Sequence, residues 1–303
     1  MSLARLDLNL LVALQALIEE RNVTRAGARV GLTQPAMSAA LARLRRHFGD
    51  ELLVRQGNRY ELTPLGVSLR HRTELAIVAA ERVFDAEPDF DPSTSDREFL
   101  VLLSDYALLV LGPAVARLLE ERAPRVRLRL EPHGPSALFD IEATLRSVDL
   151  LLLPHGFLND YPCADLYRDT WVCVAAADNN EVGDSITLDD LRSLPWITQY
   201  HRPTASTTVD RQLALLGIEH RVDLTIESFL ALPFLLAGTR RITLLQRRLA
   251  ERLAVAADVR LFPCPFDVMD LVEAAWWHPV HSADPGHLWL RALLREAAEK
   301  LPG

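Results

Sequence analysis

The stretch that most constrains the fold of this 303-residue chain runs from Leu32 to Arg46. Thr33 can cap a helix there, and Pro35 is tolerated in the first turn because amides at that point have no helical partner. Apolar residues recur at helical spacing and form one face: Met37, Leu41 and Leu44. Polar and basic residues lie on other sides: Gln34, Ser38, Arg43, Arg45 and Arg46. Such a helix can pack with one face and meet a polyanion with another.

Two predicted helices precede this stretch. Residues 8–20 are strongly apolar and are expected to form the first helix, which residues 21–23 break. A second, short helix is expected to start at Thr24, with Gly31 supplying the turn that follows it. Gly27 lies inside this second helix, at a cost of roughly 1 kcal/mol in helix propensity. Helix, short helix, turn and polar-faced helix is the order of a helix-turn-helix.

Residues 51–55 and 60–63 are strand-like and are separated by Gly57 and Asn58, which suit a tight hairpin turn. Two basic residues flank this turn: Arg55 and Arg59. The pattern predicts a wing that touches backbone phosphates.

A long helix is predicted from Thr63 and Pro64 to about Phe84, because Thr can cap and Pro fits the first turn. A solitary helix of this length with one apolar face usually has a partner, so we expect it to pair between two subunits. Prolines and acids in residues 85–95 indicate a hinge.

From Arg97 onward, short apolar strands alternate with helices in the order βαβαβ, which predicts a parallel sheet. A second α/β set follows, and residues 271–276 are expected to form a strand that returns to the first set. Asp284 and Pro285 then cap a terminal helix. Two α/β lobes joined by crossing strands imply a ligand cleft, where strand ends and helix N-termini converge.

These elements predict an α+β protein with three parts. A DNA-binding domain is expected over residues 1–64, a linker helix and hinge over 65–95, and an effector-binding domain over 96–303. Within the last part, lobe I is expected at about 96–168 and 270–303, and lobe II at about 169–269.

The net charge of −8 is distributed unevenly. Up to Gly66 there are nine arginines against six acids, a net charge of +3, so the remainder carries −11. A basic N-terminal module suits nucleic acid even though the whole chain is acidic. The sequence holds no run of 18 apolar residues, and its first residues lack the order of a secretory signal, so we expect a cytoplasmic protein.

Neither the cysteines nor the histidines indicate a metal site. Three cysteines lie far apart without Cys-x-x-Cys spacing, which favours buried free thiols, with a redox switch as the alternative: Cys163, Cys173 and Cys264. Three histidines cluster near the C-terminus: His278, His281 and His287. Pro279 interrupts them and no Glu follows at a zinc-protease spacing, so we expect them to orient the chain before the last helix. We expect no metal and no cofactor.

From Leu6 to Gly66 the sequence resembles the LysR-type transcriptional regulators, and the resemblance extends over almost the entire chain. The matching segments fall in family order: residues 8–11, 22–26, 32–38, 41–45 and 48–52. The ending from Trp277 to Arg291 is similar to the branch that contains rhizobial nodulation regulators and regulators responding to salicylate-like aromatics.

The resemblance implies a winged helix-turn-helix, a dimerising linker helix and an effector domain of periplasmic-binding-protein type, assembled as homodimers into a homotetramer. It implies promoter DNA and a small, aromatic effector as partners, with RNA polymerase as a further candidate. It places base-reading residues at Gln34, Pro35 and Ser38, the wing arginine at Arg55, and a phosphate contact at Thr24 and Arg25. Further DNA-contacting candidates are Thr33, Arg43, Arg45 and Arg59.

The candidate effector site begins at Ser104 and Asp105, after the first strand of the effector domain. Amides at a helix N-terminus attract an anion, and the family places ligand contacts here, although Ser104 could simply cap the helix. Asp105, if ionised, disfavours a carboxylate effector. The other candidates lie near strand ends or could stack on a ring: Tyr106, His133, His155, Gln199, Tyr200, His201 and Phe229. For residues 199–201 a solvated loop is the alternative.

Two functions follow as hypotheses. The first is a ligand-responsive, DNA-binding transcriptional regulator without catalytic activity. The second is an enzyme or small-molecule-binding protein that uses the α/β body, with the N-terminus serving only for oligomerisation. The sequence offers no catalytic constellation for the second, since no Gly-x-Ser-x-Gly motif surrounds Ser104.

Overall fold

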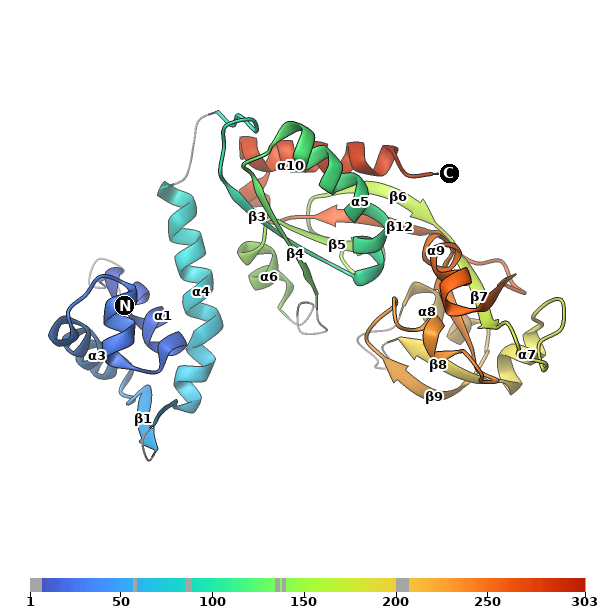
Figure 1. The fold of residues 1–303 in the computed structure, drawn as a ribbon, viewed down its shortest axis with the longest axis horizontal. Coiled ribbons are helices and arrows are strands. Elements are labelled where there is room, and N and C mark those ends of the chain that lie inside the picture. The colour runs from blue at the N-terminus through green and yellow to red at the C-terminus, as the bar shows by residue number, and fades with distance from the viewer. Residues whose placement is uncertain are drawn as a thin grey trace. The chain divides into compact units, whose positions relative to one another are not determined.

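The structure is a computed structural model that describes residues 7–56, 59–84, 89–133, 137, 140–199 and 207–302. The chain divides into two compact units, residues 1–87 and residues 88–303. Figure 1 shows the helices and strands of each unit.

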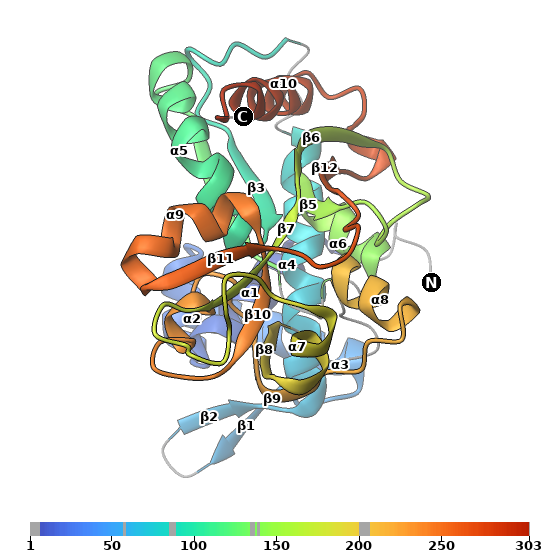
Figure 2. The same cartoon turned by 90° about the vertical axis from the view of Figure 1, so that its right-hand side faces the viewer.

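The first unit is a helical module with a hairpin. Its elements are α1 (Asn9–Glu20), α2 (Val23–Arg29), α3 (Gln34–Phe48), β1 (Leu53–Gln56), β2 (Arg59–Leu62) and α4 (Pro64–Phe84). Helices α1, α2 and α3 pack on one another around a shared apolar core, and α4 joins it through Leu65 and Leu69. This order confirms the predicted helix-turn-helix. Strands β1 and β2 pair antiparallel, and Figures 1 and 2 show them extending from the helices as an arm.

Helix α2 begins one residue earlier than predicted, at Val23 rather than Thr24. The cap is Asn22, whose side chain accepts a hydrogen bond of 3.0 Å from the Arg25 amide. Asn is among the strongest N-capping residues because its short side chain reaches back to a first-turn amide.

In the second unit, lobe I is a five-stranded sheet in the order β4-β3-β5-β12-β6. Its strands are β3 (Glu98–Leu103), β4 (Arg127–Pro132), β5 (Leu150–Pro154), β6 (Cys163–Asp169) and β12 (Leu271–Trp276). Strands β3, β4 and β5 are parallel, as predicted, and β12 runs antiparallel between β5 and β6. Helices α5 (Asp105–Arg122) and α10 (Pro285–Glu299) lie on one face, and α6 (Ile141–Ser147) lies on the other.

Lobe II is a second five-stranded sheet, in the order β11-β7-β10-β8-β9. Its strands are β7 (Trp171–Ala176), β8 (Pro195–Gln199), β9 (Arg221–Ile226), β10 (Ile242–Gln246) and β11 (Val259–Pro263). Its helices are α7 (Leu188–Ser193), α8 (Thr208–Leu215), α9 (Arg247–Ala257) and the 3-10 turn η3 (Pro233–Leu235). Strand β8 is parallel to β9 and β10, whereas β7 is antiparallel to β10 and β11.

The chain crosses between the lobes twice. It passes from β6 to β7 through Thr170, and it returns from β11 to β12 through residues 264–270. The two-lobed α/β body behind a helix-turn-helix confirms the predicted α+β fold class. Among the described helices, none has the length and apolar character that crossing a membrane requires.

Candidate DNA-contacting face and lobe junction

Helix α3 separates an apolar face from a polar one, as its sequence predicts. The Thr33 hydroxyl accepts a hydrogen bond of 3.4 Å from the Ala36 amide, which makes Thr33 the N-cap. Three side chains are buried against α1 and α2: Met37, Leu41 and Leu44. The polar positions Gln34 and Ser38, together with Pro35, are exposed. The first turn of α3 therefore presents hydrogen-bonding groups on a rigidly packed helix.

Gly27 allows α2 to approach the turn before α3. A Cβ at this position would lie 2.8 Å from the Leu32 carbonyl oxygen and 3.5 Å from Cβ of Met37. Real Cβ atoms essentially never approach a backbone oxygen so closely, so only glycine fits without a shift. The low helix propensity of Gly27 is therefore offset by close packing of the two helices.

Three of the candidate arginines of this unit are held by other groups of the chain. The Arg45 guanidinium donates to the Glu51 and Leu53 carbonyl oxygens, both at 2.9 Å, and fastens α3 to β1. Arg43 pairs with Asp7 at 2.9 Å, and Arg25 pairs with Glu20 at 3.2 Å. These contacts give Arg45 a role inside the module, whereas the exposed Arg25 and Arg43 side chains lie in weak surface pairs that a phosphate can replace.

The remaining DNA-contacting candidates lie beside α2 and on the hairpin. Thr24 is exposed in the first turn of α2, and Arg55 is exposed on β1. Arg59 begins β2 directly opposite Gln56, and its side chain lies outside the described part of the structure, as do Gly57 and Asn58.

In the second unit, Asp105 connects the two lobes. Ser104 caps α5, accepting a hydrogen bond of 3.0 Å from the Ala107 amide. The Asp105 carboxylate accepts from the Ser228 hydroxyl at 2.7 Å and from the Phe229 and Leu230 amides at 3.3 and 3.1 Å. The carboxylate charge at the start of α5 is thus bound by donors of lobe II.

Tyr106 is buried beside the same junction, and its hydrogen bond lies within lobe I. Its hydroxyl donates to the Asp169 carboxylate at 2.7 Å, and Asp169 in turn accepts from the Arg248 amide in the first turn of α9. Burial, and then the charges of nearby groups, raises the pKa of the Tyr106 phenol, and burial also raises the pKa of Asp169. Asp169 therefore links Tyr106 in lobe I to helix α9 in lobe II.

The other effector candidates divide into two groups. Phe229 is buried with its ring centre 6.2 Å from that of Tyr106, and His133 lies within electrostatic reach of Asp105, its pKa lowered mainly by burial. His155 instead contacts Asp165 at 2.6 Å and the edge of Trp276, which belongs to the core beside α6. His155 thus lies apart from the Tyr106 ring. Tyr200 and His201 fall outside the described residues.

Several buried polar atoms near the carboxyl ends of the lobe II strands have no hydrogen-bond partner among the described residues. They are Thr198 Oγ1 and Gln199 Oε1 at the end of β8 and Gln246 Oε1 at the end of β10. The Gln199 amide nitrogen does donate to the Glu227 carbonyl oxygen at 3.1 Å. Because unpaired buried acceptors are costly, these atoms favour a site for a hydrogen-bonding ligand.

The sequence pattern did not indicate two acidic residues that lie at the junction, Asp169 and Glu273. Glu273 is 1% exposed, and its Oε1 has no partner among the described residues. Burial, followed by the charge of Asp169, raises its pKa to about 8. A signal was present, since Glu273 is the only acid in the otherwise apolar strand β12.

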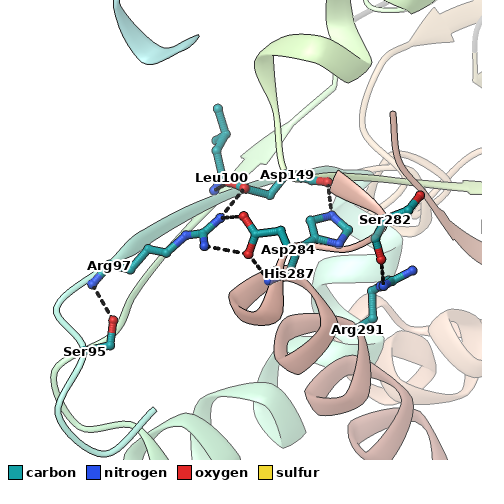
Figure 3. A network of polar contacts seen from close by, with 8 residues as sticks. All are labelled: Ser95, Arg97, Leu100, Asp149, Ser282, Asp284, His287 and Arg291. Carbon is teal, nitrogen blue, oxygen red and sulfur yellow. Dashed lines mark hydrogen bonds and ion pairs between the residues drawn. The ribbon is translucent and has the colours of Figure 1, made fainter. Parts of the chain in front are cut away.

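A network of polar contacts joins the first strand of lobe I to its last helix, as Figure 3 shows. The Arg97 guanidinium donates to both carboxylate oxygens of Asp284, at 2.8 and 2.9 Å, and lies 3.7 Å from Asp149. Asp149 accepts from the Leu100 amide, and its carbonyl oxygen lies 2.7 Å from Nε2 of His287. Strand β3, the start of β5 and helix α10 are thus joined by one network.

The two neighbouring histidines also have structural contacts. Nδ1 of His278 accepts from the Val280 amide at 3.2 Å, and the His281 ring stacks on His287 at 5.3 Å. These contacts orient the chain before α10. In the described residues, no cluster of three or more His, Cys, Asp or Glu side chains is arranged to hold a metal ion.

Comparison with known proteins identifies both units. Residues 8–67 match the model of the bacterial regulatory helix-turn-helix protein, lysR family, and residues 94–299 match the LysR substrate binding domain. Nodulation protein D 2 of Rhizobium tropici is 34% identical over 296 residues, covering 97% of this chain and 93% of its own. Nodulation protein D 1 of Rhizobium meliloti is 34% identical, covering 98% of this chain and 96% of its own.

Solved structures agree with this result. A transcriptional regulator from Pseudomonas aeruginosa superposes with a TM-score of 0.72 at 31% identity, covering 97% of this chain and 98% of that one. CbnR in complex with its target DNA shares the fold, with a TM-score of 0.66 at 17% identity and coverage of 97% and 99%. The family consists of transcriptional regulators, which decides against the enzyme hypothesis. The chain therefore belongs to the LysR family, as a DNA-binding transcriptional regulator with a substrate-binding domain.

Proposed function

We propose that the first turn of α3 reads base edges in the major groove of promoter DNA. The observation that carries this proposal is the exposure of Gln34 and Ser38 beside the buried Met37, at the start of α3. Gln can pair bidentately with adenine, and Ser can contact a base or a phosphate. Pro35 lies between them and limits the backbone freedom of this turn.

We assign contacts with the backbone phosphates of the DNA to residues around this helix. Thr33 at the cap of α3, Thr24 and Arg25 in α2, Arg43 in α3, and the hairpin arginines Arg55 and Arg59 supply hydroxyls and positive charge. Arg45 is assigned an indirect role, because its hydrogen bonds to Glu51 and Leu53 hold the hairpin against α3. Phosphate contacts of this kind fix the register of a protein on the duplex.

The effector is proposed to be a small aromatic compound that binds at the lobe junction. Ring contacts support this proposal, since the ring centre of Tyr106 lies 6.2 Å from the ring centres of both Tyr167 and Phe229. Gln199 Oε1 and Gln246 Oε1, which have no hydrogen-bond partner in the part of the chain that the structure describes, favour a ligand that carries hydroxyl donors. Binding would shift the population of lobe arrangements and hence the promoter contacts.

Assembly and location follow from the same function. Helix α4 has 21 residues, of which the first part packs on the DNA-binding module. We assign the remainder to pairing with a second copy, in a homodimer that assembles into a homotetramer. A promoter-binding regulator works in the cytoplasm, with RNA polymerase as a candidate partner.

The test of DNA binding is a gel shift with the DNA upstream of the chain's own coding region, at low salt and with a scrambled duplex as control. We expect a shifted species that survives competition by the scrambled duplex. Equal competition by both duplexes would contradict base reading. Thermal-shift screening of aromatic acids and flavonoid-like compounds tests the effector class, and stabilisation by none of them counts against it.

A further inference from the structure

Two cysteines that are distant in sequence lie together in lobe II. Sγ of Cys173, in β7, is 4.0 Å from Sγ of Cys264, which follows the last residue of β11. Strands β7 and β11 are antiparallel neighbours, with Cys173 opposite Phe262. Residues 262 and 264 project to the same side of the strand, so both thiols lie on one side of the sheet.

The surroundings of Cys264 favour its thiolate. Helix α9 begins nearby, since the Arg247 amide donates to the Thr170 carbonyl oxygen at 2.8 Å. While it is protonated, the Cys264 thiol donates to the Trp171 carbonyl oxygen at 3.4 Å. The hydrogen bond from the Cys173 thiol lowers the pKa of Cys264; burial opposes this shift, and the positive charge of Arg247 adds to it. Cys264 is half-buried, whereas Cys173 is fully buried. A reactive cysteine next to a second, resolving thiol is the usual arrangement of a redox pair.

The pair also lies beside both crossings between the lobes. Cys173 is the third residue after Thr170, through which β6 passes into β7, and Cys264 begins the segment that leads from β11 back to β12. A bond between the two sulfurs would therefore join the two chain segments that cross between the lobes.

We propose that Cys173 and Cys264 form a reversible disulfide when the protein meets a hydroperoxide. The Cys264 thiol releases its proton to solvent, and the thiolate attacks the terminal oxygen of the hydroperoxide. The O–O bond breaks, leaving a sulfenic acid on Cys264 and an alkoxide or hydroxide, which takes up a proton from solvent and departs as alcohol or water. The Cys173 sulfur then attacks the Cys264 sulfur, the S–O bond breaks, and the departing hydroxide takes the Cys173 proton as water. Two electrons pass from the thiol pair to the peroxide.

The bond requires only a local movement. A disulfide has an S–S length of about 2.05 Å, so the sulfurs must approach by about 2 Å. Cys264 lies beyond the end of β11, where no described strand pairing holds its backbone. The closed loop has its ends 91 residues apart and contains most of lobe II, so the cross-link stabilises the folded state by restricting the unfolded chain.

The experiment treats the full-length protein with equimolar hydrogen peroxide, blocks free thiols with N-ethylmaleimide and maps the peptides by mass spectrometry. We expect a Cys173–Cys264 peptide pair lighter by two hydrogens, reversed by dithiothreitol, together with a raised Tm. Amide exchange should slow around residues 170–173 and 262–270.

The matched control is C163S. Cys163 is the most exposed of the three cysteines, and its pKa is raised by burial, so it tests whether exposure alone decides which thiol is oxidised. This variant should retain the disulfide and the rise in Tm, whereas C264S and C173A should lose both, with folding checked by circular dichroism. If C173A does not fold, the half-buried C264S decides alone. Two free thiols at positions 173 and 264 after treatment, or preferential oxidation of Cys163, would overturn the proposal.

Discussion

The Asp105 carboxylate at the start of α5 accepts a hydrogen bond of 2.7 Å from the hydroxyl of Ser228 in lobe II. The Phe229 and Leu230 amides donate to the same carboxylate. One side chain of lobe I thus gathers three donors from a single turn of lobe II. Because the effector is proposed to bind at this junction, the contact sets the lobe arrangement from which ligand binding starts.

Removing this carboxylate should loosen the junction. Asp105→Ala is expected to lower the free energy of unfolding by roughly 2 kcal/mol, since hydrogen bonds to a charged group contribute about 1.5–3 kcal/mol. A double-mutant cycle with Ser228→Ala, measured by urea denaturation, should show a coupling above about 0.5 kcal/mol. Strictly additive effects would show that the two side chains do not stabilise one another in solution.

Gln34 should determine sequence preference. Gln34→Ala is expected to relax preference at one base pair, at a cost of roughly 1–3 kcal/mol in affinity for the preferred duplex, because a bidentate base contact is lost. Fluorescence anisotropy on a set of single-base variants measures this change. Arg55→Ala is the comparison: it should weaken all duplexes alike and flatten the slope of log affinity against log salt by about one. An unchanged base preference in Gln34→Ala would refute the groove assignment.

Glu273 should make the stability of the second unit pH-dependent. Its pKa is raised from 4.5 to about 8, so the folded state binds more protons than the unfolded state between these values. Its stabilising contribution is complete below pH 4.5 and is lost as pH rises through about 8. Glu273→Gln should therefore remove a fall in stability of at least about 1 kcal/mol between pH 5.5 and 8.5.

Urea denaturation at both pH values provides the measurement, with Glu251→Gln as the control because Glu251 is exposed on α9. The control should keep the pH dependence of the parent protein. If Glu273→Gln keeps it too, another group is responsible.

The Arg97 network should matter more than a surface ion pair. Arg97→Ala removes the guanidinium that contacts Asp284 and the buried Asp149. We expect a loss of roughly 2–3 kcal/mol, below the value for a fully buried pair because Arg97 is 23% exposed. Arg192→Ala breaks the exposed pair with Asp189 and should cost less than about 1 kcal/mol. Thermal unfolding distinguishes the two, and equal shifts would contradict the structural role of the network.

Gly27 and Gly112 should respond in opposite directions to alanine. Gly27→Ala introduces a Cβ 2.8 Å from the Leu32 carbonyl oxygen, so its clash should outweigh the gain in helix propensity and lower Tm. In α5, Gly112→Ala meets only the Leu108 side chain at 3.4 Å and should stabilise by about 0.5–1 kcal/mol. Calorimetry of both variants tests this, and a stabilised Gly27→Ala would mean that the turn can shift.

The sequence predicted best where structure is set by neighbours along the chain. The caps at Thr33 and Asp284 and the buried spacing of Met37, Leu41 and Leu44 are local signals, and the structure confirms them. Strand β6 was missed because its sequence, CADLYRD, lacks an apolar run, and it forms by pairing with the distant β12. Helix α9 and strand β11 were also not predicted, because they form through contacts within lobe II.

The site was less predictable because its contacts join distant segments. Arg45 and Arg43 look alike in sequence, but only the fold brings the Glu51 and Leu53 carbonyls to Arg45. The hydrogen bond from Ser228 to Asp105 joins residues 123 positions apart, and no local sequence pattern predicts it. Tyr106 was expected as a ligand contact, and its burial against Asp169 depends on where the chain crosses between lobes.

The order of strands in lobe I has a consequence for synthesis. Strand β12 lies between β5 and β6, although it follows the whole of lobe II in the chain and is therefore synthesised after it. Lobe II is continuous in the chain and can fold first, while β5 and β6 wait with open edges for their shared neighbour. A polypeptide truncated before β12 would thus contain a folded lobe II beside an incomplete lobe I. The unpaired edges of β5 and β6 would then be exposed to aggregation or to proteases.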